Sequence, residues 1–289
     1  MPTINIPLNY KKLQKLRGDD PFSKEIPFLI TRIYKLSIKY LRGCSKHSLI
    51  SQVSGKTYIS FESGGKSSRA VNVLLYDDDF NKWRKLRQCM HKDDFSTMTT
   101  EEVNNVIYTI AISFCAFIDL TKSRDQQTPG TFFHYLISFF MTWRLQVPPK
   151  NTIEILKLED SKDKDLQTDL IFEIDKRIKF HVPVKTSTRE RAIMLWAHQK
   201  LLDGVYGIER FMGTAVLLAE TKKGTNDKVS EIWTKGQWCV YQSYIARLRR
   251  VYYLDPPYGY EKLIAEAPPV VIKPFADFLI KEWNSLLVI

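Results

Sequence analysis

Cysteine and histidine are scarce in this chain of 289 residues, and neither forms a metal-binding pattern. The four cysteines, Cys44, Cys89, Cys115 and Cys239, lie far apart, and none belongs to a C-x-x-C pair. This spacing excludes a disulfide scaffold and a zinc cluster, and it is typical of reduced thiols in the cytoplasm. The five histidines show neither H-x-x-x-H nor H-E-x-x-H spacing, so the sequence does not support zinc hydrolysis.

The chain also lacks an apolar leader and a long uninterrupted apolar run. Its first residues, MPTINIPLNYKK, contain no charged start followed by an apolar segment, so no signal peptide is expected. The longest apolar stretch, Val106 to Leu120, contains Thr109 and Ser113 and is broken by Asp119. It is therefore short of the ~20 residues that a membrane span needs. We expect a cytoplasmic protein that does not associate with a membrane.

Acidic residues are few in the first third of the chain. Residues 1–100 contain 18 Lys and Arg against 9 Asp and Glu, residues 101–150 contain 4 of each, and residues 151–289 contain 21 and 19. The net charge of +11 therefore belongs mainly to the first third. Such an excess is typical of a surface that binds nucleic acid or an anionic membrane, and a solubilising surface has the same composition.

The basic first third begins as a helical region. Residues 24–42 place apolar side chains on one stripe, which predicts an amphipathic helix. A second short helix is expected from Ser45 to Val53, and two strands, Thr57–Phe61 and Ala70–Leu75, follow around a glycine loop. Helix, helix and hairpin is the order of a winged helix-turn-helix. A small helical region with an ordinary glycine hairpin has the same order and is the more common structure.

Two basic groups in this region are candidates for DNA contacts. The first lies at the tip of the predicted hairpin and consists of Lys66 and Arg69. The second is a short basic segment beside Trp83 and consists of Lys82, Arg84, Lys85 and Arg87. Phosphate contacts and a solvated helix face explain this second segment equally well.

The composition changes near residue 125, where we place a boundary. A capping box at Thr99 and Glu102 opens a helix that runs through Phe117, and Phe132–Trp143 predicts another. Further strands are expected at Thr152–Leu158, Thr168–Ile174, Ile178–Thr186, Met212–Thr221, Val229–Thr234 and Arg250–Leu254, with helices at Arg189–Leu202 and Gln237–Arg247. This order predicts an α/β fold, with a mixed sheet flanked by helices in residues 126–289 and a mainly helical, basic region in residues 1–125.

The strands on either side of Asp175 form a predicted antiparallel hairpin. Depending on the length of the turn, Asp169 on the first strand faces Val184 or Lys185 on the second. Side chains that oppose each other in this way have Cβ atoms about 4.5–5.5 Å apart. A carboxylate and an ammonium at this distance form either a plain salt bridge or part of an active site.

The order of elements around this pair resembles the core of the PD-(D/E)XK nucleases. A helix precedes the hairpin, and a helix and another strand follow it. More narrowly, the segment Pro-Val-Lys-Thr-Ser-Thr-Arg-Glu-Arg-Ala, residues 183–192, and the later Val-Leu-Leu-Ala-Glu-Thr-Lys resemble a type II restriction endonuclease. The resemblance extends from about Thr128 to Asp255 and implies a restriction-endonuclease-like core, to which the basic first third adds DNA contacts.

The resemblance implies a role for each residue that matches the motif. Asp169 would bind the metal, and Lys185 would position or deprotonate the attacking water. Pro183 replaces the second acidic residue of the motif. Mg²⁺ would then be held by Asp169, the backbone carbonyl of Val184, a phosphate oxygen and waters. Glu190, at the start of the next helix, is the candidate for the missing acid, with a salt bridge to a neighbouring arginine as the alternative.

Three other polar residues are weaker candidates for the site. Glu173 lies about 13 Å along the strand from Asp169, at about 3.3 Å per residue, so it cannot share a metal with Asp169. Glu220 ends a later strand, where a structural role is the simpler interpretation. His134 lies where enzymes of this class commonly carry a Glu, and a position at the edge of the core is the simpler interpretation here too.

The function expected from this resemblance is that of a type II site-specific deoxyribonuclease. It would cleave double-stranded DNA with Mg²⁺, as a homodimer, in a restriction system with a cognate DNA methyltransferase. Two alternatives stay open. One is a structure-specific or repair nuclease of the same fold. The other is a non-catalytic nucleic-acid-binding protein in which Asp169 and Lys185 form only a salt bridge.

Overall fold

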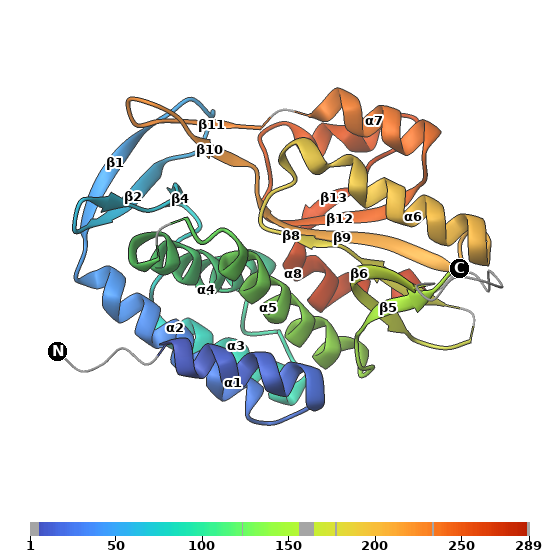
Figure 1. The fold of residues 1–289 in the computed structure, drawn as a ribbon, viewed down its shortest axis with the longest axis horizontal. Coiled ribbons are helices and arrows are strands. Elements are labelled where there is room, and N and C mark those ends of the chain that lie inside the picture. The colour runs from blue at the N-terminus through green and yellow to red at the C-terminus, as the bar shows by residue number, and fades with distance from the viewer. Residues whose placement is uncertain (1–5, 123, 156–164, 177, 233, 288–289) are drawn as a thin grey trace.

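Two β-sheets and the helices packed on them make up the structure, which is a computed structural model of the chain (Figure 1). It describes residues 6–122, 124–155, 165–176, 178–232 and 234–287, with the backbone alone at positions 190 and 287.

The larger sheet has seven strands and carries the predicted hairpin. Its order is β13-β12-β9-β7-β6-β5, with β8 beside β9. The strands are β5 (Lys150–Glu154), β6 (Asp165–Glu173), β7 (Lys179–Val182), β8 (Val184–Lys185), β9 (Phe211–Ala219), β12 (Leu248–Asp255) and β13 (Ile272–Pro274). Strands β5, β6 and β7 are antiparallel, whereas β7, β9, β12 and β13 run parallel. The expected mixed sheet is therefore confirmed.

Helices cover both faces of this sheet (Figure 1). One face packs against α6 (Ile193–Tyr206) and α7 (Lys235–Tyr244), and the other against α4 (Thr100–Thr121), α5 (Gln127–Leu145) and α8 (Phe275–Asp277). Alternation along β9 explains the two layers, because successive side chains of a strand point to opposite faces. Ala215 and Leu217 belong to the cluster under α6 and α7, whereas Val216 and Leu218 belong to the cluster under α4 and α5.

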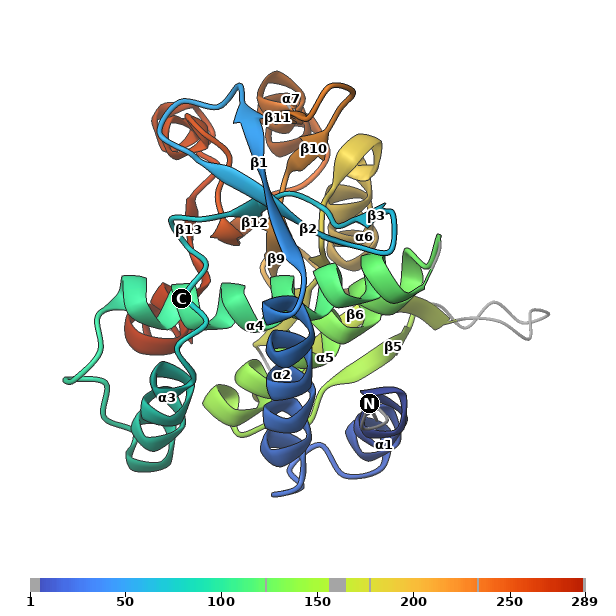
Figure 2. The same ribbon diagram turned by 90° about the vertical axis from the view of Figure 1, so that its left-hand side faces the viewer.

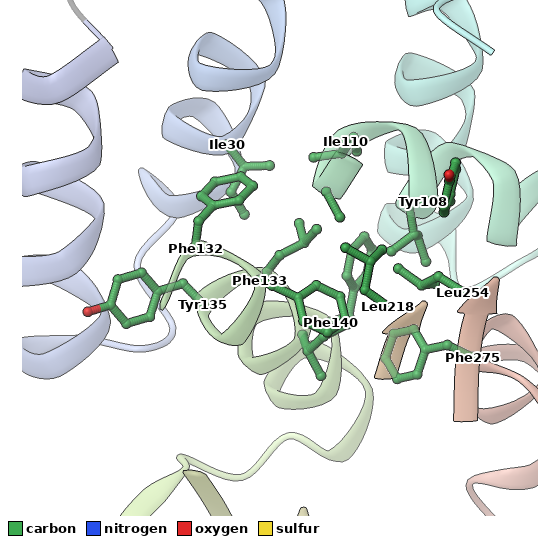
Figure 3. Packing of buried hydrophobic residues seen from close by; sticks show 14 of the residues in the cluster. Ile30, Tyr108, Ile110, Phe132, Phe133, Tyr135, Phe140, Leu218, Leu254 and Phe275 are labelled. Atoms are coloured by element: carbon green, nitrogen blue, oxygen red, sulfur yellow. The ribbon is translucent and has the colours of Figure 1, made fainter. Parts of the chain in front are cut away.

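Helix α4 runs through the main core. It begins at the predicted capping box, where Glu102 N–H donates to Thr99 Oγ1 and Thr99 N–H donates to Glu102 Oε2, at 3.1 and 2.8 Å. By length and composition alone this helix is apolar enough to cross a membrane, but 89% of its most apolar window is buried inside the structure. Figure 3 shows its residues Tyr108 and Ile110 within the core cluster.

The first third of the chain differs from the expected winged helix. Its helices are α1 (Ile6–Asp19), α2 (Ile26–Arg42) and α3 (Phe80–Lys92). The expected helix at Ser45–Val53 is wrong, because Ser45–Ser51 forms strand β1. This strand belongs to a six-stranded sheet with β2 (Tyr58–Ser63), β3 (Lys66–Ser67), β4 (Val71–Asn72), β10 (Thr221–Lys223) and β11 (Lys228–Glu231).

Pairing with a distant segment accounts for strand β1. It pairs antiparallel with β2, and Ile50 and Ser51 also pair in parallel with Lys228 and Val229 of β11. The strand expected at Val229–Thr234 therefore completes the smaller sheet and not the larger one. No local pattern in residues 45–53 contains this information.

The turn between α4 and α5 coincides with the boundary expected near residue 125. Side chains from both sides of that turn share the main hydrophobic cluster, including Ile30 of α2, Phe140 of α5 and Leu254 of β12 (Figure 3). Strands β1 and β11 add a backbone connection between the two regions. Residues 1–125 and 126–289 therefore share one core.

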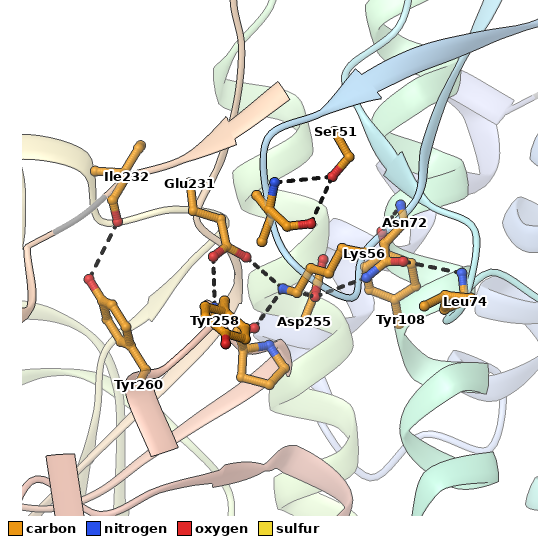
Figure 4. Close-up of polar contacts among 12 residues, drawn as sticks. Ser51, Lys56, Asn72, Leu74, Tyr108, Glu231, Ile232, Asp255, Tyr258 and Tyr260 are labelled. Carbon is orange, nitrogen blue, oxygen red and sulfur yellow. Dashed lines mark hydrogen bonds and ion pairs between the residues drawn. The ribbon is translucent and has the colours of Figure 1, made fainter. Parts of the chain in front are cut away.

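A buried ionic group, here called the Lys56 cluster, joins the two sheets (Figure 4). Lys56 Nζ lies 2.6 Å from Glu231 Oε1, from Asp255 Oδ1 and from the carbonyl oxygen of Pro256. The side chains of Lys56, Glu231 and Asp255 are 12%, 6% and 1% exposed. Burial raises the pKa of Asp255, and Lys56 opposes that shift. The cluster ties the loop between β1 and β2 to the end of β12.

Candidate active site

Asp169 and Lys185 lie side by side at the end of the hairpin. Lys185 Nζ is 2.8 Å from Asp169 Oδ2, and the backbone N–H of Val184 donates to the same oxygen at 2.9 Å. Strand β8, which carries Lys185, is held by β9 through the pairs Val184 with Val216 and Lys185 with Leu217. The predicted proximity of the carboxylate and the ammonium is confirmed.

The register of the hairpin differs from both sequence-based alternatives. Leu170 pairs with Val182, and the turn begins at Asp175, whose Oδ1 accepts the N–H of Ile178. Asp169 therefore comes opposite Pro183. Proline has no N–H for the ladder, so pairing between β6 and β7 stops there, and the carboxylate of Asp169 binds the next N–H instead.

A cavity of about 440 Å³ opens beside this pair. Its lining includes Asp169, Lys185, Ser187, Arg191, Met194 and His198. Sequence reasoning did not select Arg191, Met194 or His198. Their spacing of three and four residues places them on one face of a helix, which is a signal that the sequence contained. What it did not contain is which face of α6 turns toward Asp169.

His134 of α5 holds the backbone of the site. Its Nε2 lies 2.8 Å from the carbonyl oxygen of Asp169. A carbonyl only accepts hydrogen bonds, so the hydrogen is on Nε2. Burial lowers the pKa of His134, which keeps the ring neutral. His134 thus contacts the main chain of Asp169.

Glu220 fixes the turn that follows Lys185. This carboxylate, which is 1% exposed, accepts hydrogen bonds from the hydroxyl of Ser187 and from the N–H and hydroxyl of Thr188, at 2.7 to 2.8 Å. The hydroxyl of Tyr253 adds a fourth bond at 3.2 Å. Both oxygens of Glu220 accept hydrogen bonds in this way, which agrees with a structural role.

The residues around Asp169 fit a Mg²⁺ ion that protein and substrate hold together. Asp169 is the carboxylate of the cavity lining, and within the described residues its Oδ1 has no hydrogen bond. The N–H of Val184 faces Asp169. Because the N–H and the C=O of a strand residue point to the same edge of the strand, the carbonyl of Val184 also lies on the side of Asp169. Mg²⁺ commonly takes one or two carboxylates, substrate phosphate and waters.

Among the described side chains, no second carboxylate lines the cavity beside Asp169. The described part of the chain contains no group of three or more His, Cys, Asp or Glu that could hold a metal. Glu190 lies in the 3-10 turn Arg189–Arg191, and its side chain is outside the described residues. Glu173 pairs instead with Lys150 and Lys179, as its distance along the strand implied.

Arg69 does not present its guanidinium as we expected. Its Nε and Nη2 donate to the two oxygens of Asp119 at 2.7 and 2.9 Å, and its backbone N–H also donates to Asp119. This two-bond pair uses two of the five N–H donors of the guanidinium and offsets its charge. Arg69 therefore fixes the hairpin to α4, and its contact with DNA stays a prediction. Lys66, on the short strand β3, has a partly exposed side chain.

The basic segment of α3 lies away from the cavity. Figure 2 shows α3 on the opposite side of α2 from α6 and β6. Lys82 pairs with Asp77, Arg84 lies over the ring of Phe80, and Arg87 lies over the ring of Phe28, while Lys85 is exposed. The structure thus does not bring these four residues together with Asp169 and Lys185.

Comparison with known proteins gives one extensive structural match. No family model and no curated protein sequence matches the chain. Among solved structures, the type IIP restriction endonuclease Kpn2I is similar with a TM-score of 0.81 and 20% identity, and the match covers 98% of both chains. A restriction endonuclease PspGI–substrate DNA complex is also found, with a TM-score of 0.37, 12% identity and coverage of 65% of this chain and 76% of that one.

The match to Kpn2I covers nearly the whole of both chains. The resemblance inferred from residues 128–255 therefore extends over the whole length. This chain has the fold of a type II restriction endonuclease.

Proposed function

We propose that this protein is a type II site-specific deoxyribonuclease that hydrolyses phosphodiester bonds in double-stranded DNA with Mg²⁺. The observation that carries the proposal is the pair of Asp169 and Lys185, 2.8 Å apart beside a cavity, in a fold shared with a type IIP restriction endonuclease. The same fold supports more than one activity, so the proposal depends on the site and not on the fold alone.

The surroundings of the pair favour an active site over a plain salt bridge. The side chains of Lys185 and Asp169 are 47% and 25% exposed, and an ion pair with this exposure stabilises a fold by about 1 kcal/mol or less. Yet Val184 holds the carboxylate of Asp169, and His134 holds its carbonyl. This degree of fixation is expected where a carboxylate must keep its position for chemistry.

Lys185 can serve the substrate while it stays near Asp169. Its ammonium has three N–H donors, of which the contact with Asp169 occupies one. The other two can face an oxygen of the scissile phosphate and the attacking water. They would orient that water and offset the negative charge that develops on the phosphate.

Asp169 Oδ1 and the carbonyl of Val184 would hold Mg²⁺ together with the phosphate. When bound, the ion supplies a Lewis acid for the phosphoryl oxygen and lowers the pKa of a coordinated water. One protein carboxylate binds this ion weakly, so we expect tight binding only with DNA present.

We also propose that the protein acts as a homodimer in the cytoplasm. Cleavage of both strands of a duplex needs an active site for each strand, and two copies supply them. A restriction enzyme further needs a cognate DNA methyltransferase to protect the host genome, so we expect one in the same system.

The test is incubation of the purified protein with phage DNA and Mg²⁺. Discrete fragments support the proposal, whereas cleavage only at unusual DNA structures indicates a repair nuclease. Binding without cleavage under any divalent metal refutes the nuclease proposal and favours the non-catalytic alternative. That alternative is supported by Pro183, which replaces the second acidic residue of the motif.

Variants of the pair locate the chemistry. Asp169→Ala and Lys185→Ala should abolish cleavage and leave DNA binding largely intact. Lys150→Ala is the matched control, because Lys150 also pairs with a carboxylate on β6 but does not line the cavity. Unchanged cleavage by Asp169→Ala or Lys185→Ala would place the active site elsewhere.

A further inference from the structure

A second, larger cavity lies directly beside the catalytic one. It has a volume of about 800 Å³ and lies between the tip of the smaller sheet, at Ser67 and Ser68, and the turn after Lys185. The two cavities share Ser187, Thr188 and Arg191. A polymer bound at Asp169 and Lys185 can therefore continue into the larger cavity, here called the side cleft.

Cationic residues outnumber acidic ones in the lining of the side cleft. Its lining contains five cationic residues, Arg69, Lys122, Arg124, Arg189 and Arg191, against two acidic ones, Asp119 and Asp125.

Both acids already have partners. Asp119 binds Arg69, and Asp125 lies 3.3 Å from Lys122 and 2.6 Å from the hydroxyl of Thr128. Within the described side chains, the three remaining arginines make no ion pair. Free guanidinium groups with serine and threonine hydroxyls around them are the groups that bind a phosphodiester backbone.

Arg124 is the free arginine that the catalytic motif does not explain. It lies on the exposed turn between α4 and α5 and has φ of +61°, a conformation that non-glycine residues seldom adopt. The next residue, Asp125, is bound to α5, because its Oδ1 accepts the N–H of Thr128 in the first turn of that helix. Arg124 thus lines the cleft next to a residue that α5 anchors.

We propose that the side cleft holds the DNA backbone next to the scissile phosphate and that Arg124 contacts a phosphate there. The inference rests on the proposed function, because it takes DNA as the substrate. It assigns a part of the electrostatic attraction for DNA to the α4–α5 turn, whereas the charge distribution of the sequence had assigned it to residues 1–100.

The experiment measures the salt dependence of DNA binding by Arg124→Asn and by a matched control. Asparagine tolerates positive φ, so this variant keeps the turn. Arg84→Gln on α3 removes the same charge from an equally exposed position outside both cavities. The probe is a fluorescein-labelled DNA duplex, titrated by anisotropy in EDTA at several salt concentrations, so that no cleavage occurs.

Loss of one phosphate contact should lower the slope of log Kd against log salt by about 0.9 in Arg124→Asn and leave it unchanged in Arg84→Gln. A lower slope in Arg84→Gln with an unchanged slope in Arg124→Asn overturns the inference. Equal slopes for the wild type and Arg124→Asn, at unchanged melting temperature, overturn it as well. Failure of the proposed function looks different: the wild type would bind DNA with the Arg124-dependent slope but never cut it.

Discussion

Replacement of Lys56 by Met should destabilise the fold much more than the loss of an ordinary surface charge. Lys56 is the cation of the Lys56 cluster, and its Nζ has three oxygen partners at 2.6 Å. Without it, the carboxylates of Glu231 and Asp255 face each other with side chains 6% and 1% exposed. In addition, Asp255 Oδ2 is already buried and has no hydrogen-bond partner among the described residues.

The size of the effect follows from the burial of the charges that are left. Removal of one partner from a buried ion pair costs about 3–5 kcal/mol, because the remaining charge stays out of water. Two carboxylates remain here, so we expect the free energy of unfolding of Lys56→Met to fall by about 3–5 kcal/mol near neutral pH. The matched control is Lys82→Met. It breaks a pair with Asp77 whose side chains are 38% and 34% exposed, and it should cost about 1 kcal/mol or less.

The loss should also depend on pH in one direction. Burial raises the pKa of Asp255, and Lys56 opposes this shift, so the variant raises that pKa further. A group with a higher pKa in the folded than in the unfolded state holds its proton more tightly when folded. The stability that this group contributes to the fold is therefore lost as pH rises through the folded pKa. Urea unfolding should show the smallest cost of Lys56→Met at acidic pH. A cost equal to that of Lys82→Met, or one independent of pH, would refute the reasoning.

Two histidines give further predictions. Burial lowers the pKa of His181 to about 4, so the stability that neutral His181 contributes is complete above about pH 6.5 and is lost as pH falls toward 4. The free energy lost in this way is up to about 3 kcal/mol. In urea unfolding, His181→Gln should reduce this loss. His134→Leu removes the donor to the carbonyl of Asp169 and should slow single-turnover cleavage by about 10- to 100-fold. His134→Gln should restore most of the rate. If His134→Gln and His134→Leu lose the same amount of rate and the same amount of melting temperature, a positioning role is contradicted.

Local sequence features predicted the parts of the structure that depend on neighbours in the chain. Thr99 and Glu102 are three residues apart, and their reciprocal bonds form as expected. Asp169 and Lys185 belong to one hairpin, so their proximity needed only the turn between them. Even there the register was wrong, because Asp175 accepts the N–H of Ile178 and draws the turn back by one residue.

Contacts between distant segments explain what the sequence could not predict. Ser45–Ser51 is a strand because β2 and β11 pair with it, and β11 lies far along the chain. The face of α6 that carries Met194 and His198 is set by its packing on the sheet. Both features depend on the tertiary fold, which no window of residues contains.

The charge of the first third shows why net charge alone does not locate a binding surface. Four of its cations pair with carboxylates in the described part of the chain: Arg42 binds Asp78, Lys56 binds two buried carboxylates, Arg69 binds Asp119, and Lys82 binds Asp77. A cation in such a pair has little attraction left for phosphate, although it still counts toward +11. The free arginines of the side cleft come from residues 124, 189 and 191, in segments that are close to neutral overall. The local balance after pairing, and not the regional sum, is therefore what a DNA backbone would encounter.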